Sequence, residues 1–174
     1  MPSAHNFSAI MAAAETPGFT DGMLWNPPSS TRELEAALKR SWNGWKTGGS
    51  YTWTMESQHD QCLIGRFSIR LHLPKDNVWS LGYWVHPDFQ NQGYATEGAA
   101  ELIRAGFLEI EAEKIVASHA KWNEASGKVL KKIGMQCIGE TEEGFLKHGK
   151  WVAEYDYVIF KASYVENRRC SIWG

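Results

Sequence analysis

The alternation of apolar and polar side chains divides the chain into predicted strands and helices. Strand-like runs span residues 51–55, 62–71, 78–86, 114–120, 135–143 and 151–161. Helical patterns span residues 31–46, 96–113 and 124–133. In the longest helix, Ile103, Phe107 and Ile110 recur at helical spacing, and the charged positions lie largely off that stripe. The pattern therefore predicts one buried face on this helix.

The predicted order is helix, three strands, helix, strand, helix and two strands. A strand–helix–strand step inside a meander requires one parallel pair, so the fold class is α+β (mixed α/β). We expect a central, mixed but mostly antiparallel sheet with helices on both faces. A length of 174 residues suits a single domain, 1–174. Within it, residues 1–30 show only a short alanine-rich helical pattern over 7–15, and the tail 162–174 has no strong pattern.

The composition and net charge limit the kinds of partner that the chain is expected to bind. The formal net charge is −2, so overall charge indicates neither nucleic acid nor an anionic membrane. No apolar stretch approaches the roughly 18–20 residues needed to span a membrane, and the N-terminus has no signal-peptide pattern. The three cysteines show no metal-ligand spacing, so no metal is expected. Cys62 and Cys137 lie in strand-like runs and are interpreted as buried thiols, which favours a reducing, cytoplasmic location.

A glycine-bearing turn between a strand and the longest helix is the clearest candidate for chemistry. Residues 90–95 place consecutive backbone N–H groups at a helix N-terminus, where the helix dipole also favours an anion. The turn predicts either a phosphate site or a tight turn without a ligand. The glycine patterns of dinucleotide-binding folds and of P-loops are missing from the sequence.

The stretch LGYWVHPDFQNQGYATE at 81–97 resembles the acetyl-CoA-binding motif of the GCN5-related N-acetyltransferases (GNAT), with Gln90, Gly93 and Ala95 at the motif positions. A second block, residues 122–135, resembles the Asn-x-x-Ser helix of the RimJ/RimL-like ribosomal-protein branch. The resemblance covers about residues 31–161 in element order and implies a GNAT-like fold. It also implies a CoA site at Trp84, Val85, Gln90, Asn91, Gln92, Gly93, Tyr94, Ala95, Thr96 and Asn123.

By the same resemblance, the chain is expected to be an acetyl-CoA-dependent N-acetyltransferase. The acetyl group would pass to a primary amine by direct attack in a ternary complex. The favoured acceptor is a protein or peptide N-terminal α-amine. The alternatives are a small-molecule amine acetyltransferase, acting on a toxin, antibiotic or polyamine, and a non-catalytic CoA-binding sensor.

The resemblance also suggests catalytic residues. Ser126 would lie near the sulfur as proton donor, and Asn123 would contact the pantetheine arm, although both types are also ordinary at a helix start. Glu143, with Glu140 and Glu142 as alternatives, is a candidate base. Ser80 stands where many family members have a glutamate.

The front of the chain also departs from the family. The family's first strand has no counterpart in residues 1–30. A missing edge strand would leave the next strand's edge unpaired, which favours a homodimer.

Overall fold

Six strands form one sheet in the order β1-β2-β3-β4-β6-β5. The computed structural model describes the backbone of residues 2–172 and the side chains of residues 2–166. The strands are β1 (Ser50–Glu56), β2 (Leu63–Leu73), β3 (Val78–Val85), β4 (Lys114–Ala120), β5 (Gln136–Lys147) and β6 (Lys150–Phe160). Only β3 and β4 pair in parallel, and every other neighbouring pair is antiparallel. The predicted mixed, mostly antiparallel sheet is confirmed.

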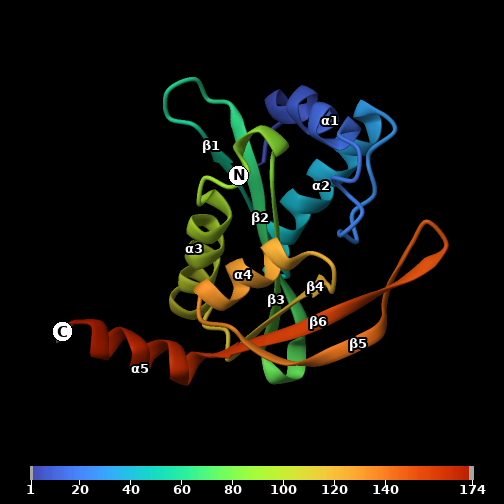
Figure 1. Cartoon of the computed structure of the whole chain (residues 1–174). Coiled ribbons are helices and arrows are strands. Elements are labelled where there is room, and N and C mark those ends of the chain that lie inside the picture. The colour runs from blue at the N-terminus through green and yellow to red at the C-terminus, as the bar shows by residue number, and fades with distance from the viewer. Residues whose placement is uncertain (1, 173–174) are drawn as a thin grey trace.

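Helices cover both faces of this sheet (Figure 1). They are α1 (Phe7–Glu15), α2 (Thr31–Thr47), α3 (Tyr94–Leu108), α4 (Glu124–Lys132) and α5 (Lys161–Ile172). Helices α3 and α4 lie on one face: a Cβ on Gly98 of α3 would meet the Phe67 ring, and a Cβ on Gly127 of α4 would meet His119. Helix α2 lies across the other face, close enough that a Cβ on Gly44 would overlap the Ser50 hydroxyl.

The two faces of the sheet differ in chemistry because side chains alternate along each strand. The face under α3 is apolar, and its buried residues include Phe67, Ile69, Leu81 and Ile115. The opposite face, which we call the α2 face, is mostly polar. Its polar side chains, placed by the strand registers, are those of Ser50, Thr52, Thr54, Arg66, Ser68, Arg70, Ser80, Ser118, Glu154 and Asp156. Val78, Trp84, Val116, Ala120 and Val158 lie on the same face.

The N-terminal segment contains no strand among residues 2–30. Helix α1 occupies the short helical pattern at 7–15, and turns and extended backbone follow it. Strand β1 is therefore an edge strand within the described residues. The indole Nε1 of Trp45 donates to the Thr52 carbonyl, 3.2 Å away, and so occupies one acceptor of β1. The homodimer stays a prediction.

The structure differs from the sequence prediction at the end of α3 and in the C-terminal tail. Helix α3 ends at Leu108 rather than 113, because the N–H groups of Ile110 and Ala112 turn back to the carbonyls of Ala105 and Gly106. The tail, in which the sequence shows no strong pattern, forms α5 from Lys161.

The interpretation of Cys62 and Cys137 as buried thiols is wrong. Cys62 and Cys137 are exposed rather than buried, since Cys62 lies just before β2 and Cys137 lies on the edge strand β5. The side chain of Cys170 lies outside the described residues. No helix among those described is both long and apolar enough to cross a membrane.

The contact between α3 and the sheet depends on a glycine. A Cβ at Gly98 would lie 2.3 Å from the ring of Phe67, which is 3% exposed. Gly98→Ala should therefore lower the free energy of unfolding by about 1–3 kcal/mol, the usual cost of overpacking a core. Gly82→Ala is the control, since its Cβ would meet only the Ser68 hydroxyl at 3.7 Å. Urea denaturation measures both, and equal stability of the two variants would contradict the packing argument.

Candidate active site

The sheet splits between β3 and β4. Their parallel pairing covers only Val78–Ser80 on β3 and Lys114–Val116 on β4. Beyond that point β3 stays paired with β2 as far as Val85, and β4 stays paired with β6 as far as Ala120. Each strand is held by its outer neighbour, so a gap opens between them.

Backbone groups of β3 point into this gap. The His86 N–H donates to the Ile64 carbonyl at 2.8 Å. Antiparallel ladders alternate, so the backbone groups of Trp84 face β2, whereas those of Tyr83 and Val85 face the gap. Polar backbone groups need a partner, and the gap leaves Tyr83 and Val85 without a neighbouring strand. An extended ligand with amide groups would supply one.

The glycine turn lies at the wide end of the gap. Gly93 is the N-cap of α3 with φ of 91°, and Asn91 is also left-handed with φ of 60°. Within the described residues, no protein acceptor takes the backbone N–H groups of residues 91–95. A Cβ at Gly93 would meet nothing within 4 Å. Free donors, a helix N-terminus and open space together form an anion cradle.

Two side chains of the predicted motif brace this turn. Gln90 Nε2 donates to the Val85 carbonyl at 3.2 Å, and Gln92 Nε2 donates to the Asp88 carbonyl at 3.2 Å. Gln90 therefore ties the turn to the end of β3. The remaining predicted residues of the turn, Tyr94, Ala95 and Thr96, form the first residues of α3.

Asn123 and Ser126 lie at the start of α4, directly after β4. The Asn123 Oδ1 accepts from the Ser126 N–H at 3.2 Å and caps the helix. The Ser126 hydroxyl lies 3.0 Å from the hydroxyl of Tyr83, which also donates to the Ser126 carbonyl at 3.4 Å. The pair therefore joins β3 to α4 across the split.

Tyr83 was not predicted as a site residue. Burial raises the pKa of Tyr83 to about 12, so its hydroxyl keeps its proton at neutral pH. A neutral phenol next to Ser126 can donate a hydrogen bond to it. The sequence carries no local signal for this pair, because the two residues are 43 positions apart and meet only through the sheet.

The predicted acidic residues do not converge on the gap. Lys121 Nζ lies 3.0 Å from a Glu140 carboxylate oxygen and 2.6 Å from one of Glu142. Glu143 is exposed and lies where β5 loses its register with β6. The predicted base therefore lies in an irregular edge strand, where Glu143 has no hydrogen-bond or ion-pair partner among the described residues.

Glu154 is a carboxylate on β6, one strand beyond the split. It lies on β6 opposite Ala120, on the α2 face, and accepts from the Ser118 hydroxyl at 2.9 Å. Burial, followed by the neighbouring charge of Asp156, raises its pKa. A carboxylate with a raised pKa binds protons more readily, which is the property of a general base.

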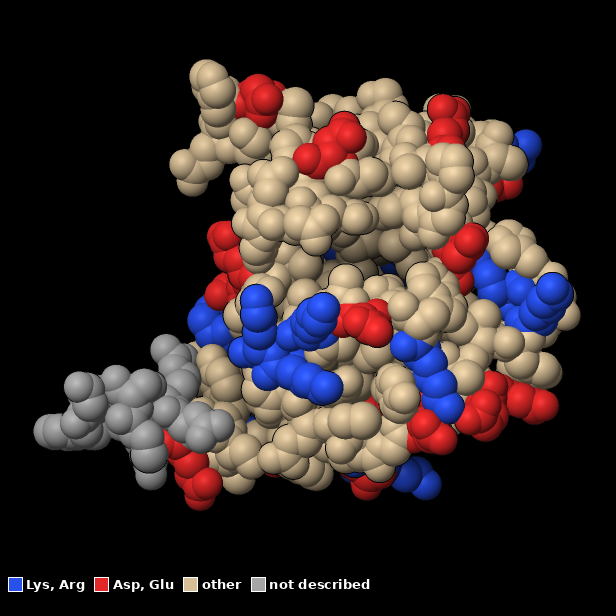
Figure 2. All heavy atoms as spheres, viewed as in Figure 1, with Lys and Arg blue, Asp and Glu red and all other residues tan. Residues whose placement is uncertain are grey.

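The segment between α1 and α2 covers this side of the gap. The buried Lys147 Nζ donates to the carbonyls of Met23 and Trp25 and to Asn26 Oδ1, at 2.8–3.1 Å. The Trp25 ring stacks on Trp84 with centroids 5.9 Å apart. Figure 2 shows the molecule hollowed between this segment and α4.

Positive charge gathers over α4 (Figure 2). The lysines of this helix are Lys128, Lys131 and Lys132. The described residues hold no group of three side chains suited to a metal ion.

The chain matches known acetyltransferases. The acetyltransferase (GNAT) domain family matches residues 3–136. Among curated proteins, YnaD of Bacillus subtilis, an uncharacterized N-acetyltransferase, is 32% identical over 102 residues, 59% of this chain and 59% of that protein. YdaF of the same organism, a candidate ribosomal N-acetyltransferase, is 28% identical over 91 residues, 52% of this chain and 50% of that protein. The matches thus span less than two thirds of these relatives.

Solved structures show the same fold. RimL, a ribosomal L7/L12 α-N-protein acetyltransferase in complex with coenzyme A, has a TM-score of 0.81 and 16% identity, and covers 91% of this chain and 90% of its own. The spermidine N-acetyltransferase of Vibrio cholerae with CoA and spermine has a TM-score of 0.81 and 16% identity, covering 94% and 95%. The mixed sheet and its helices therefore belong to a known architecture. The chain is a member of the GNAT acetyltransferase family, and its relatives include the RimL-like proteins that its motifs resemble.

Proposed function

We propose that the protein transfers an acetyl group from acetyl-CoA to a primary amine, with a protein or peptide α-amine as the favoured acceptor. The observation that carries this proposal is the row of free N–H groups at residues 91–95, placed at the open end of the β3–β4 gap. The cradle fits a pyrophosphate, and the backbone of Tyr83 and Val85 fits the amides of a pantetheine arm. The lysines of α4 add positive charge on the side of the phosphates.

The residues around the split can supply the proton transfers that accompany acetyl transfer. Bound acetyl-CoA supplies an activated acyl carbon as a thioester. The amine nitrogen forms the new C–N bond as the C–S bond breaks, and the departing sulfur needs a proton. Ser126 donates that proton, and Tyr83 passes its own proton to the Ser126 oxygen through the 3.0 Å hydroxyl contact. A proton from solvent then restores the Tyr83 hydroxyl, so both groups end the cycle neutral. Asn123 holds Ser126 in place by capping α4.

Glu154 is our candidate for the base that takes the proton from the amine. It faces the α2 side of the sheet, opposite the side where α3 and α4 would hold the phosphates. The acceptor would then approach through the hollow under the α1–α2 segment. An α-amine has an unperturbed pKa of about 7.7–8.0, so a weak base suffices for it.

Turnover separates an enzyme from a CoA-binding sensor. CoA release should be measured with a panel of peptides and small amines, alongside calorimetry with CoA. We expect turnover with peptides bearing a free N-terminus. CoA binding without turnover on any amine would support the sensor, and no CoA binding would reject the proposed site.

Gly93→Asp tests the cradle. A carboxylate at this position would point into the open space where a phosphate would lie, so we expect CoA affinity to fall about tenfold or more. Gly149→Asp is the matched control, because Gly149 is also left-handed with φ of 75° and has nothing within 4 Å of a Cβ. Calorimetry measures both affinities. Equal CoA affinity in the two variants would show that the turn does not hold the pyrophosphate.

Tyr83→Phe tests the proton path. Removing the hydroxyl should lower kcat by about 10–100-fold, within the range of positioned acid–base groups. The dissociation constant for acetyl-CoA should change little, because the backbone of Tyr83 is kept. Stopped-flow thiol release and calorimetry give the two values. An unchanged kcat would show that the Tyr83–Ser126 contact stabilises the structure and takes no part in proton transfer.

Glu154→Gln tests the base. Glu154 must be ionised to accept a proton, so wild-type activity should fall as the pH drops through its raised pKa, and this acidic limb should vanish in the variant. The raised pKa also means that the ionised form opposes folding, so stability near pH 7 should not decrease in the variant. Glu143→Gln is the comparison for the residue predicted from sequence. Loss of the limb in Glu143→Gln, and not in Glu154→Gln, would assign the role to Glu143.

A further inference from the structure

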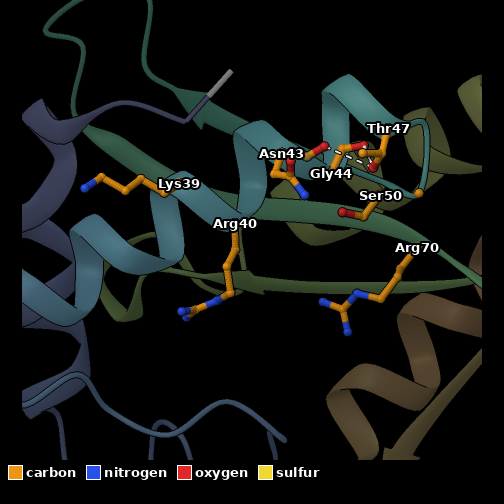
Figure 3. Close-up of a pocket in the computed structure, with 8 residues that line it drawn as sticks. Lys39, Arg40, Asn43, Gly44, Thr47, Ser50 and Arg70 are labelled. Atoms are coloured by element: carbon orange, nitrogen blue, oxygen red, sulfur yellow. Dashed lines mark hydrogen bonds between the residues drawn. The ribbon is translucent and has the colours of Figure 1, made fainter.

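A basic groove lies on the α2 face between α2 and the first two strands. Its volume is about 540 Å³, and it is lined by Lys39, Arg40, Asn43, Gly44, Thr47, Gly49, Ser50 and Arg70. Figure 3 shows the side chains of Arg40 and Arg70 extending to the same side of the strands, with their guanidinium groups toward one open space. Lys39 points away from them. The groove therefore offers two guanidinium groups on the same side of the strands.

These charges have no acidic partner in the described part of the chain. Neither Arg40 nor Arg70 makes a side-chain hydrogen bond or ion pair there. Arg66 lies on the same face of β2 as Arg70, and its Nε is buried without a hydrogen-bond partner. The buried hydroxyl of Thr54, opposite Arg66 in the β1–β2 ladder, also lacks a partner. Unpaired guanidinium groups lining a groove favour an anion, which would satisfy them in a planar, bidentate manner.

The groove adjoins the point where the sheet splits. Arg70 is paired with Ser80, and the Ser80 hydroxyl donates to the Arg70 carbonyl at 3.4 Å. Ser80 is also the last residue of β3 that pairs with β4. Glu154 and Asp156 lie on the same face across the split. The α2 face is therefore positive on the α2 and β2 side and negative on the β6 side.

We propose that the amine acceptor carries carboxylates close to its amine, as an acidic N-terminal peptide segment does, and that Arg40 and Arg70 bind them. This inference rests on the proposed acetyl transfer. The amine would lie toward Glu154, and the acidic side chains would lie in the groove. A polyamine fits poorly, because its second cation would face Arg40 and Arg70.

Matched peptides test the proposal. The acceptors are Ser-Asp-Asp-Ala-Ala amide, its isosteric partner Ser-Asn-Asn-Ala-Ala amide, and spermidine, each assayed by CoA release at saturating acetyl-CoA. We expect kcat/KM for the acidic peptide to exceed that for its amide partner by about tenfold, as charge-assisted bonds to arginine predict. The preference should shrink to about twofold or less in Arg40→Ala/Arg70→Ala, with unchanged affinity for acetyl-CoA. Lys75→Ala/Lys150→Ala removes two exposed lysines elsewhere and should keep the preference.

Three outcomes would overturn the proposal: equal use of the two peptides, better use of spermidine, or a preference that survives the double arginine substitution. A separate measurement distinguishes this failure from a failure of the proposed activity. Anisotropy with a C-terminally labelled acidic peptide measures binding to the CoA-saturated protein. Arginine-dependent peptide binding without turnover would support the groove as a peptide site and reject acetyl transfer. Turnover without a preference for the acidic peptide would support acetyl transfer and reject the groove as a peptide site.

Discussion

The separation of β3 from β4 is the constraint on which the rest of the site depends. Hydrogen bonding to β2 holds β3, and hydrogen bonding to β6 holds β4, so neither strand can close the gap without breaking a ladder. The gap leaves polar backbone groups of Tyr83 and Val85 without a strand partner, and such groups are costly when buried and unpaired. The Gln90 side chain donates to the Val85 carbonyl, and water or a ligand can pair with the other groups. The fold thus keeps a binding slot open by the same bonds that stabilise the sheet.

The split also brings together groups that lie on different elements. Helix α3 follows β3 after the short 3-10 helix Pro87–Phe89 and the glycine turn, and α4 follows β4 after a three-residue connection. Two helix N-termini therefore flank the gap, one with free N–H groups and one capped by Asn123. The Tyr83–Ser126 contact is a consequence of this arrangement. Gly127 permits it, because any side chain there would collide with His119 and lift α4 from the sheet.

Much of this arrangement could be predicted from the sequence, because local patterns determine it. The apolar stripe of α3, the left-handed glycine after α2 and the turn at Gly93 are each encoded within a few residues. The register of β6 against β4 is not encoded locally, and Glu154 reaches the site only through it. The Arg40–Arg70 groove likewise depends on how α2 lies over the sheet. The resemblance to the RimJ/RimL-like branch indicates Glu143 as a base, and this stays a prediction: Glu143 is exposed on β5, where the pairing with β6 is irregular.

In the proposed function, the two faces of the sheet divide the work between the cosubstrate and the acceptor. The anion cradle and the gap backbone lie in the segment that carries the motif. The proposed acceptor side is built from α2, β2, β6 and residues 16–30, and none of these carries the motif. Its N-terminal part is fastened by Lys147, whose buried ammonium donates three hydrogen bonds to residues 23–26 and has no bonded carboxylate among the described residues. Substitutions in these elements can change the acceptor without disturbing the cradle, so a shared motif carries little information about which amine is modified.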